Sequence, residues 1–368
     1  MKTNRFDMFM GRMFVSLLIC AISFLLLDVV SRQFFSNRTK IEQRFPVEES
    51  RQPMPYCMFS GKPSGEKYNS LGYKGPVPEV PKPKGEYRII FLGGSTLLTG
   101  DPSIPELVQD RFISEDLSQV KVFNFGVVSS VSTMELVKLL EEVVDYQPDM
   151  VVMYNGGNDL IQPFVHDPRP GYPFNFIVYE HNPLSESDIG KYPALALFAY
   201  GSNIMRILLP KYFAKRFIPM DEARESTGFL SKEWKENIAT IYVRNLQKAG
   251  KVSNAFGSEF VAFFQPIVYY KQKINEKERP LLNDQVKGDL LGIRKMILRK
   301  IKQLKRQYDV DVVDLSDVYA TENGQIFTDH IHIVQEAKPV IGKMMCRHLI
   351  PAVRKDLWRS GDRRLDPN

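Results

Sequence analysis

Cysteine is scarce in this chain: its 368 residues include three, at positions 20, 57 and 346. No two of them have the short spacing of metal ligands, so the sequence gives no support for a zinc site. Cys57 and Cys346 could form one disulfide in an exported domain or stay two unrelated free thiols, and both alternatives are open.

Two kinds of binding signature are missing as well. The chain has neither a Gly-Lys-Ser/Thr ending nor a Gly-x-Gly-x-x-Gly pattern, which removes the standard nucleotide motifs. Its 49 Lys and Arg residues against 43 Asp and Glu residues give a net charge of only +6. No basic stripe interleaved with aromatic residues is present, so we expect no nucleic-acid partner.

One long apolar run is present near the N-terminus. Residues 13–30 read MFVSLLICAISFLLLDVV, nearly the roughly 20 residues that a helix needs to cross a bilayer. The sequence after the run has no convincing small-x-small cleavage site, which favours an uncleaved anchor over a signal peptide. Basic residues lie on both sides of the run, so the positive-inside rule does not decide its orientation. The short N-terminus makes a single-pass protein of the cytoplasmic membrane, with its domain outside (periplasmic), the simplest expectation.

The chain divides into four parts by composition. Residues 1–31 are the predicted membrane anchor, and residues 32–85 are rich in proline and read as a stalk and lead-in. Residues 86–350 form the predicted compact domain, with an irregular insertion or cap at 160–228, and residues 351–368 form a basic tail.

Strand and helix patterns alternate through the compact domain. Apolar runs predict five strands, at about 87–92, 120–125, 149–154, 259–264 and 311–315. Helical patterns fit about 131–146, 231–250, 283–307 and 335–349. This alternation predicts an α/β fold with a five-stranded parallel sheet covered on both faces.

Polar or glycine-rich turns follow the first three of these strands. Ser95 follows two glycines after the first strand, Gly126 follows the second, and Asn158 follows the third. Since the carboxyl ends of parallel strands meet at one edge, these residues should converge there. Asp329 stands three residues before His332, a spacing that lets a carboxylate orient a histidine as a base for Ser95.

Taken together, the motifs resemble the four blocks of the SGNH (GDSL-like) hydrolase family. The matching residues are Gly93-Gly94-Ser95, Gly126, Gly156-Gly157-Asn158-Asp159 and Asp329-x-x-His332. The resemblance covers about 86–350, and the lead-in from about 69 is similar to a membrane-anchored bacterial branch that carries Gly-Gly-Ser-Thr.

The resemblance implies a flavodoxin-like α/β/α sandwich and a role for each matched residue. Ser95 would be the nucleophile, His332 the general base and acid, and Asp329 its orienting partner. The backbone N–H groups of Ser95 and Gly126 and the side-chain amide of Asn158 would form the oxyanion hole. No metal or organic cofactor is called for. Gly94, Gly157 and Asp159 would be supporting residues.

The chain departs from the family pattern at two places, and simpler interpretations exist. Gly94 stands where the family's name motif has Asp, and no Pro-Glu-Gly-like turn follows His332. His330 is a second candidate base, although its spacing from Asp329 is wrong. Ser95 could also be an ordinary turn serine, Asn158 and Asp159 a helix N-cap, and Asp329 with His332 a solvated turn.

We therefore expect a membrane-anchored serine esterase that cleaves an ester through an acyl-enzyme. By analogy alone, its substrate would be an O-acyl group, plausibly O-acetyl, on a cell-envelope or secreted glycan. An O-acyltransferase using the same triad is one alternative. A non-catalytic envelope-assembly protein is another, against which the retention of all four blocks argues.

Overall fold

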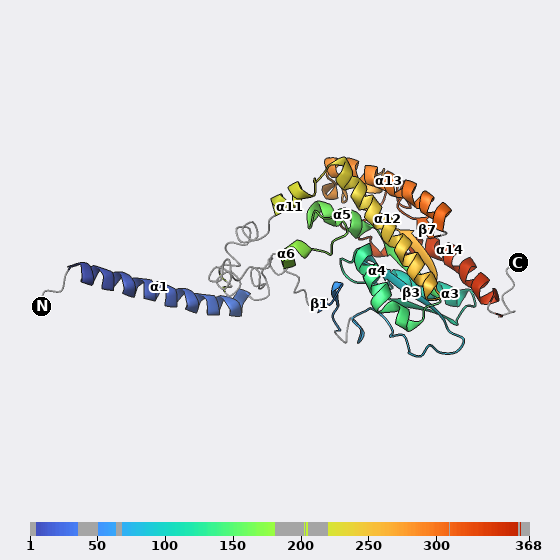
Figure 1. Ribbon diagram of the computed structural model, residues 1–368, viewed down its shortest axis with the longest axis horizontal. Helices are drawn as coiled ribbons and strands as arrows, with labels where there is room; N and C mark the ends of the chain where they lie inside the picture. The colour runs from blue at the N-terminus through green and yellow to red at the C-terminus, as the bar shows by residue number, and fades with distance from the viewer. Residues whose placement is uncertain are drawn as a thin grey trace. The chain divides into compact units, whose positions relative to one another are not determined.

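The computed structural model describes residues 5–35, 51–63, 68–180, 202, 204, 220–308, 310–359 and 361. The chain forms two compact units, Met1–Glu48 with Ile177–Glu222, and Glu49–Phe176 with Ala223–Asn368 (Figure 1). Parts of the stalk, the insertion at 160–228 and the C-terminal tail lie outside the described residues.

The second unit is built on a five-stranded parallel sheet, as the sequence predicts. Its strands are β3 (Tyr87–Gly93), β4 (Val120–Asn124), β5 (Met150–Asn155), β6 (Glu259–Phe264) and β7 (Asp311–Asp314). Their spatial order is β4-β3-β5-β6-β7, and every neighbouring pair is parallel. The chain therefore turns to opposite sides of β3, and this reversal of strand order is where open α/β sheets place their binding crevice.

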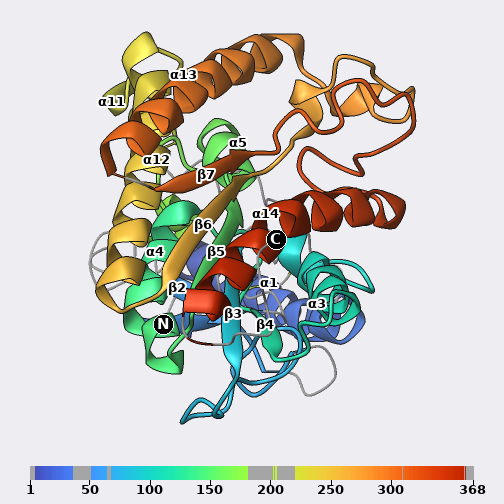
Figure 2. The same ribbon diagram turned by 90° about the vertical axis from the view of Figure 1, so that its right-hand side faces the viewer.

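Helices cover both faces of this sheet, giving three layers (Figure 2). On one side α12 (Lys232–Ala255) packs against α4 (Ser132–Glu141) and α13 (Asp284–Tyr308). On the other side α14 (Lys338–Arg359) packs against α3 (Ile104–Ser114). The shorter helices are α2 (Ser95–Leu98), α5 (Gly157–Val165), α6 (Phe176–Glu180), α11 (Met220–Ser226), η1 (Val143–Tyr146), η2 (Val268–Tyr270), η3 (Arg279–Leu281) and η4 (Gln335–Ala337).

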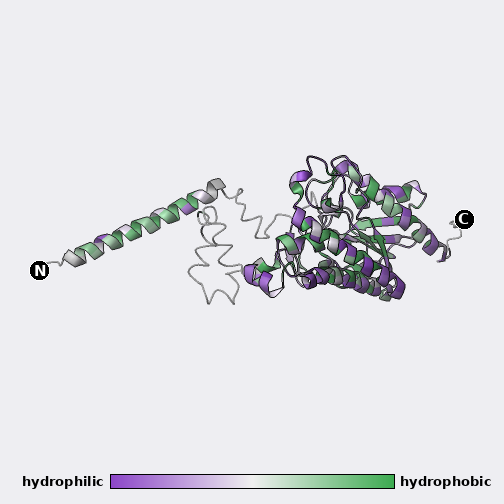
Figure 3. Ribbon diagram, turned by 90° about the horizontal axis from the view of Figure 1, so that it is seen from above, coloured by the Kyte–Doolittle hydropathy of each residue, from purple (hydrophilic) through white to green (hydrophobic). Residues whose placement is uncertain are grey.

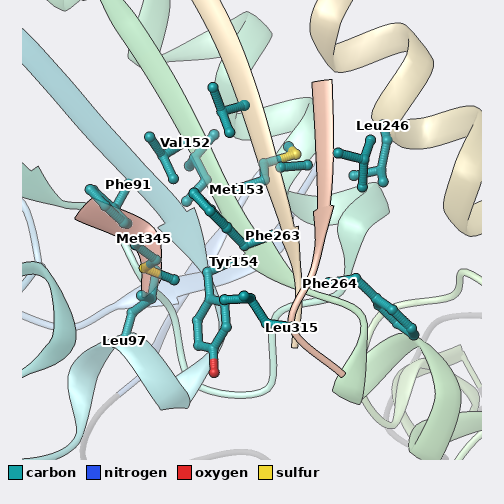
Figure 4. Packing of buried hydrophobic residues seen from close by; sticks show 14 of the residues in the cluster. Phe91, Leu97, Val152, Met153, Tyr154, Leu246, Phe263, Phe264, Leu315 and Met345 are labelled. Atoms are coloured by element: carbon teal, nitrogen blue, oxygen red, sulfur yellow. The ribbon is translucent and has the colours of Figure 1, made fainter. Parts of the chain in front are cut away.

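The core lies between the sheet and the two helix layers. All six residues of β5 are buried, which explains why the sequence shows a continuous apolar run there rather than alternation. Phe91, Leu97 and Met345 pack on one side, whereas Leu246 of α12 packs on the other (Figure 4). Full burial of such side chains stabilises the fold by roughly 1.5–3 kcal/mol each.

Three helices have different limits from those that the periodicity predicts, and one of them, expected over 231–250, continues to Ala255. The helix expected over 131–146 ends at Glu141, and a 3-10 turn follows up to Gln147, which has a positive φ of 51°. The last helix continues through Pro351 to Arg359, because Val353 and Leu357 extend its core-facing side beyond residue 349.

Part of the predicted stalk folds against the sheet domain. Strands β1 (Arg51–Met54) and β2 (Met58–Gly61) form an antiparallel hairpin. The buried Lys138 of α4 donates to Ser60 Oγ at 3.1 Å and to Tyr73 Oη at 2.5 Å, and pairs with Glu142 at 3.1 Å. A buried cation thus fastens the lead-in to α4. Cys57 of this hairpin and Cys346 of α14 are buried free thiols.

In the first unit, α1 (Arg5–Phe35) contains the apolar run (Figure 3). The stretch Met8–Ser31 contains an 18-residue window with a mean hydropathy of 2.6, so it is long and apolar enough to cross a membrane. Asp28 is the acidic residue within this stretch, and its carboxylate accepts hydrogen bonds from Ser202 Oγ at 2.8 Å and Ile204 N at 2.9 Å.

Candidate active site

A tight turn after β3 presents Ser95. A Cβ atom on Gly93 would lie 2.5 Å from the Tyr154 carbonyl oxygen, and one on Gly94 would lie 2.7 Å from Asn158 Nδ2. Gly93 is therefore required because a side chain would clash with the backbone of β5, whereas a methyl group at Gly94 would displace the end of the Asn158 side chain. Ser95 begins α2 at this turn and is half-buried at the carboxyl edge of the sheet.

A loop after β7 brings the Asp–His pair to this serine. His332 Nε2 lies 2.6 Å from Ser95 Oγ, and His332 Nδ1 lies 2.6 Å from Asp329 Oδ2. Asp329 Oδ1 also accepts the backbone N–H groups of Ile331 and His332, each at 2.8 Å. Three side chains distant in sequence thus form one continuous chain of hydrogen bonds.

The charge on Asp329 favours one arrangement of protons in this chain. Burial would raise the pKa of the Asp329 carboxyl, but the bonds from the His332 ring and from two backbone N–H groups outweigh it and hold the pKa at about 2. An ionised Asp329 accepts a proton-bearing Nδ1, which leaves Nε2 of a neutral His332 free to accept the Ser95 hydroxyl proton.

The second histidine of the loop has different contacts. The His330 ring stacks on Tyr269 with centroids 5.6 Å apart, and the His330 carbonyl accepts the Val268 N–H at 3.0 Å. His330 borders a cavity of about 410 Å³ that also contacts Ile161 and Phe164 of α5. The structure therefore places His332, and not His330, against Ser95.

Asn158 at the start of α5 is well placed as a hydrogen-bond donor. Its Nδ2 donates one hydrogen to the Ser130 carbonyl at 2.7 Å, and an amide nitrogen carries a second hydrogen. The side chain is half-buried, and it lies so close to the turn that carries Ser95 that a Cβ on Gly94 would clash with its amide.

The backbone N–H of Gly126, a predicted oxyanion donor, already makes a hydrogen bond within the protein. This N–H donates to Asn124 Oδ1 at 3.0 Å, while Asn124 Nδ2 donates to the Leu97 carbonyl at 2.9 Å. A Cβ on Gly126 would meet the Leu97 side chain and the Gly94 carbonyl at 3.0 and 3.2 Å. Gly126 thus packs against the turn that carries Ser95. Its role as an oxyanion donor stays a prediction, which requires its N–H to leave Asn124.

The backbone N–H of Ser129 is a candidate oxyanion donor that the sequence analysis did not identify. Ser129 has a positive φ of 60° within a turn closed by the Ser130 N–H and the Val127 carbonyl. Gln162 Nε2 donates to its carbonyl and Arg51 Nη2 to its hydroxyl, each at 2.8 Å. Its backbone N–H has no hydrogen-bond acceptor within the part of the chain that the structure describes. A glycine here would have signalled the left-handed backbone, whereas serine gives no such signal.

The two remaining predicted residues are buried around the start of α5. A Cβ on Gly157 would lie 2.1 Å from Gln265 Nε2 and 2.9 Å from Ile331 Cγ2, so this glycine lets the loop that carries Asp329 and His332 pack closely. The Asp159 carboxylate accepts the Ser132 hydroxyl at 2.5 Å and the Ser132 N–H at 3.1 Å, which joins α5 to α4. Burial raises the pKa of Asp159 to about 6, although the bonds from Ser132 oppose the shift.

A second buried carboxyl lies near Asp159. Glu135 Oε2 accepts a hydrogen bond from Asn155 Nδ2, and Asn155 Oδ1 accepts the Tyr242 hydroxyl at 3.0 Å. Burial, and then the negative charge of Asp159, raises the pKa of Glu135 to about 8. Glu135 is therefore largely protonated at neutral pH. Sequence patterns give no sign of this cluster.

No protein-family model matches the chain, and no curated protein sequence matches it. Among solved structures, a GDSL-like lipase from Bacteroides thetaiotaomicron is similar at 12% identity and a TM-score of 0.41, over 75% of this chain and 93% of that one. The psychrotrophic esterase EstA from a Pseudoalteromonas species is similar at 13% identity and a TM-score of 0.41, over 73% of this chain and 99% of that one. The acetyl xylan esterase AlAXEase is similar at 13% identity and a TM-score of 0.38, over 70% of this chain and 97% of that one.

Proposed function

We propose that the chain is a membrane-anchored serine esterase of the SGNH type. The observation that carries this proposal is the hydrogen-bonded series from Ser95 Oγ through the His332 ring to Asp329, with 2.6 Å at both steps. A nucleophile, a base and an orienting carboxylate in this order define the serine-hydrolase arrangement.

The proposed reaction has two halves. In the first, Ser95 Oγ attacks the ester carbonyl carbon while His332 Nε2 takes the hydroxyl proton. The tetrahedral intermediate collapses as His332 gives that proton to the departing alcohol, which leaves an acyl group on Ser95. In the second half His332 removes a proton from water, the water oxygen attacks the acyl carbonyl, and the Ser95 hydroxyl is restored.

The oxyanion of each intermediate needs donors placed in advance. We propose the Ser95 N–H and the second hydrogen of Asn158 Nδ2, together with a backbone N–H from the segment after β4. Gly126 is the donor implied by the family resemblance, and Ser129 is the donor whose N–H has no acceptor among the described residues. Loss of one such donor costs roughly 3 kcal/mol of transition-state stabilisation.

The cavity beside His330 is the proposed substrate site. Aromatic rings line it, Phe164, Phe229 and Tyr269, and polar side chains including Asn283 and Asp289 also border it. Aromatic faces mixed with hydrogen-bonding groups suit a sugar ring. We therefore propose an O-acyl ester, such as an O-acetyl group, on a cell-envelope or secreted glycan, with α1 holding the domain outside the cytoplasmic membrane.

Hydrolysis of 4-nitrophenyl acetate by the full chain in detergent tests the serine mechanism. We expect Ser95→Ala and His332→Ala each to lower kcat by several orders of magnitude. His348→Ala is the matched control, because His348 pairs with Asp311 on β7 and not with Ser95. Equal activity in Ser95→Ala and the wild type would overturn the proposal.

The same assay can separate hydrolysis from acyl transfer. An added glycan with free hydroxyl groups would receive the acyl group from a transferase, and acylated glycan would then appear at the expense of free acetate. Periplasmic placement is tested by fusing alkaline phosphatase to the C-terminus. The fusion should be active, and an inactive fusion beside an active cytoplasmic reporter would reverse the proposed orientation.

A further inference from the structure

A second buried ion pair lies outside the triad, in the segment that follows β6. Lys271 Nζ lies 2.6 Å from Glu278 Oε2, and their side chains are 1% and 0% exposed. Two charges removed from water to this degree are costly unless every one of their hydrogen-bonding groups finds a partner. The partners of this pair therefore indicate what it does.

Most of these partners belong to the segment that leads into the triad loop. Glu278 Oε1 accepts the backbone N–H groups of Ile326 and Phe327, at 2.8 and 2.9 Å. Lys271 Nζ donates to the Gly324 carbonyl at 2.8 Å. The pair thus hydrogen-bonds the backbone of residues 324–327, a segment that ends two residues before Asp329.

Residues 324–327 form the base of the loop that carries Asp329 and His332. The Val334 N–H donates to the Ile326 carbonyl at 2.7 Å, and Phe327 and Ile333 form an antiparallel bridge. Above this base, the Thr328 N–H donates to the His332 carbonyl at 2.9 Å. Any shift of this base should therefore also move His332, which contacts Ser95, and Asp329, which holds the His332 ring.

We propose that the Lys271–Glu278 pair positions the catalytic Asp–His loop, an inference that rests on the esterase function proposed above. The pair fixes where the loop begins, so that Asp329 holds the His332 ring and His332 reaches Ser95 at hydrogen-bonding distance. Displacements of about 1 Å at reacting groups can lower rates by roughly 100-fold. Neither residue touches the reacting atoms, so both are positioning residues.

The chain contains a matched control for this role. Lys138 and Glu142 also form a largely buried pair, at 3.1 Å with side chains 1% and 19% exposed, but they fasten the lead-in to α4. Removal of one partner from either pair should lower the unfolding temperature, because it leaves the other charge buried and uncompensated. Only loss of the Lys271–Glu278 pair should disturb the triad.

The test compares Glu278→Gln, Lys271→Met/Glu278→Met and Lys138→Met in the full chain in detergent, with 4-nitrophenyl acetate well below each unfolding temperature. We expect kcat to fall about 10- to 100-fold in both changes at the Glu278 site, with KM within about twofold, and to stay near wild type in Lys138→Met. The double variant leaves no uncompensated buried charge, so it should regain thermal stability without regaining kcat. Wild-type kcat in a folded double variant would overturn the proposal.

A second measurement does not depend on turnover. The proton on His332 Nδ1 gives a far-downfield NMR signal when Asp329 holds it, and His332→Ala identifies that signal among the five histidines of the chain. We expect the signal to be lost or broadened in Glu278→Gln and retained in Lys138→Met. If the wild type hydrolyses no ester but this pattern appears, the esterase proposal fails and the positioning role stands. An unchanged signal in the double variant would refute the positioning role.

Discussion

Glu135 provides a direct test of the electrostatics beneath the site. Its side chain is 1% exposed, and burial beside Asp159 raises its pKa from 4.5 to about 8. Between these values the unfolded chain has lost this proton while the folded chain keeps it. The folded state then binds more protons than the unfolded state, so the free energy of unfolding must fall as pH rises from 4.5 to 8.

The size of the effect follows from the same shift. Each pH unit within this window costs up to about 1.4 kcal/mol, so the interval from pH 6 to pH 8 costs roughly 2 kcal/mol, since Glu135 is partly ionised near pH 8. Glu135→Gln keeps the size of the side chain and an oxygen that can accept from Asn155, but it cannot ionise. Relative to the wild type, this variant should gain roughly 2 kcal/mol of stability between pH 6 and pH 8.

Thermal unfolding of both proteins at pH 5, 6, 7, 8 and 9 measures this difference. Trp234 is buried in α12, so tryptophan fluorescence reports on the sheet domain. The variant should match or fall below the wild type at pH 5 and exceed it by several degrees at pH 8. Glu141→Gln, a change at an exposed position of the same helix α4, serves as the control. A difference between wild type and Glu135→Gln that does not change with pH would refute the buried, protonated state of Glu135.

Three further predictions concern the site itself. Gly94→Ala should push Asn158 out of place, because its Cβ would lie 2.7 Å from Nδ2; we expect kcat to fall 10-fold or more with little loss of thermal stability, and an unchanged kcat would remove Asn158 from the oxyanion hole. Asp329→Asn should lower kcat by several orders of magnitude, because the His332 ring would lose its proton acceptor at Nδ1; a pH–rate profile checks this, and a wild-type rate near pH 7 would contradict it. His330→Ala should raise KM for a glycan ester several-fold and leave the acylation rate of 4-nitrophenyl acetate within about tenfold. Loss of that acylation rate would instead make His330 part of the triad.

Much of the fold could be predicted from the sequence because parallel strands leave a local signal. The run Met150–Asn155 is apolar at nearly every position because both faces of β5 are covered. The inner strands β3 and β6 are buried in the same way, whereas the edge strands β4 and β7 are partly exposed. The helix ends were less predictable. The end of α14 depends on whether Val353 and Leu357 find the core, which is a property of the assembled layers and not of the local sequence.

The residues around the triad show where sequence reasoning stops. Ser95 and Asn158 follow strands that could be predicted to be parallel, so their meeting at one edge of the sheet is expected, and His332 joins them because of its spacing from Asp329. Ser129 and Glu278 have no such pattern. The position of Ser129 depends on a left-handed backbone turn, which a serine does not indicate in a sequence. The role of Glu278 depends on a loop 48 residues away in the chain.

The topology explains why so few positions carry the chemistry while so many support it. The reversal of strand order at β3 leaves one edge where the turns after β3, β4 and β5 meet. Ser95 and Asn158 come from these rigid turns, whereas Asp329 and His332 come from a loop that follows β7, two strands away from β5. A loop at that distance needs its own fixed base to reach Ser95 at 2.6 Å, and the buried Lys271–Glu278 pair lies at that base.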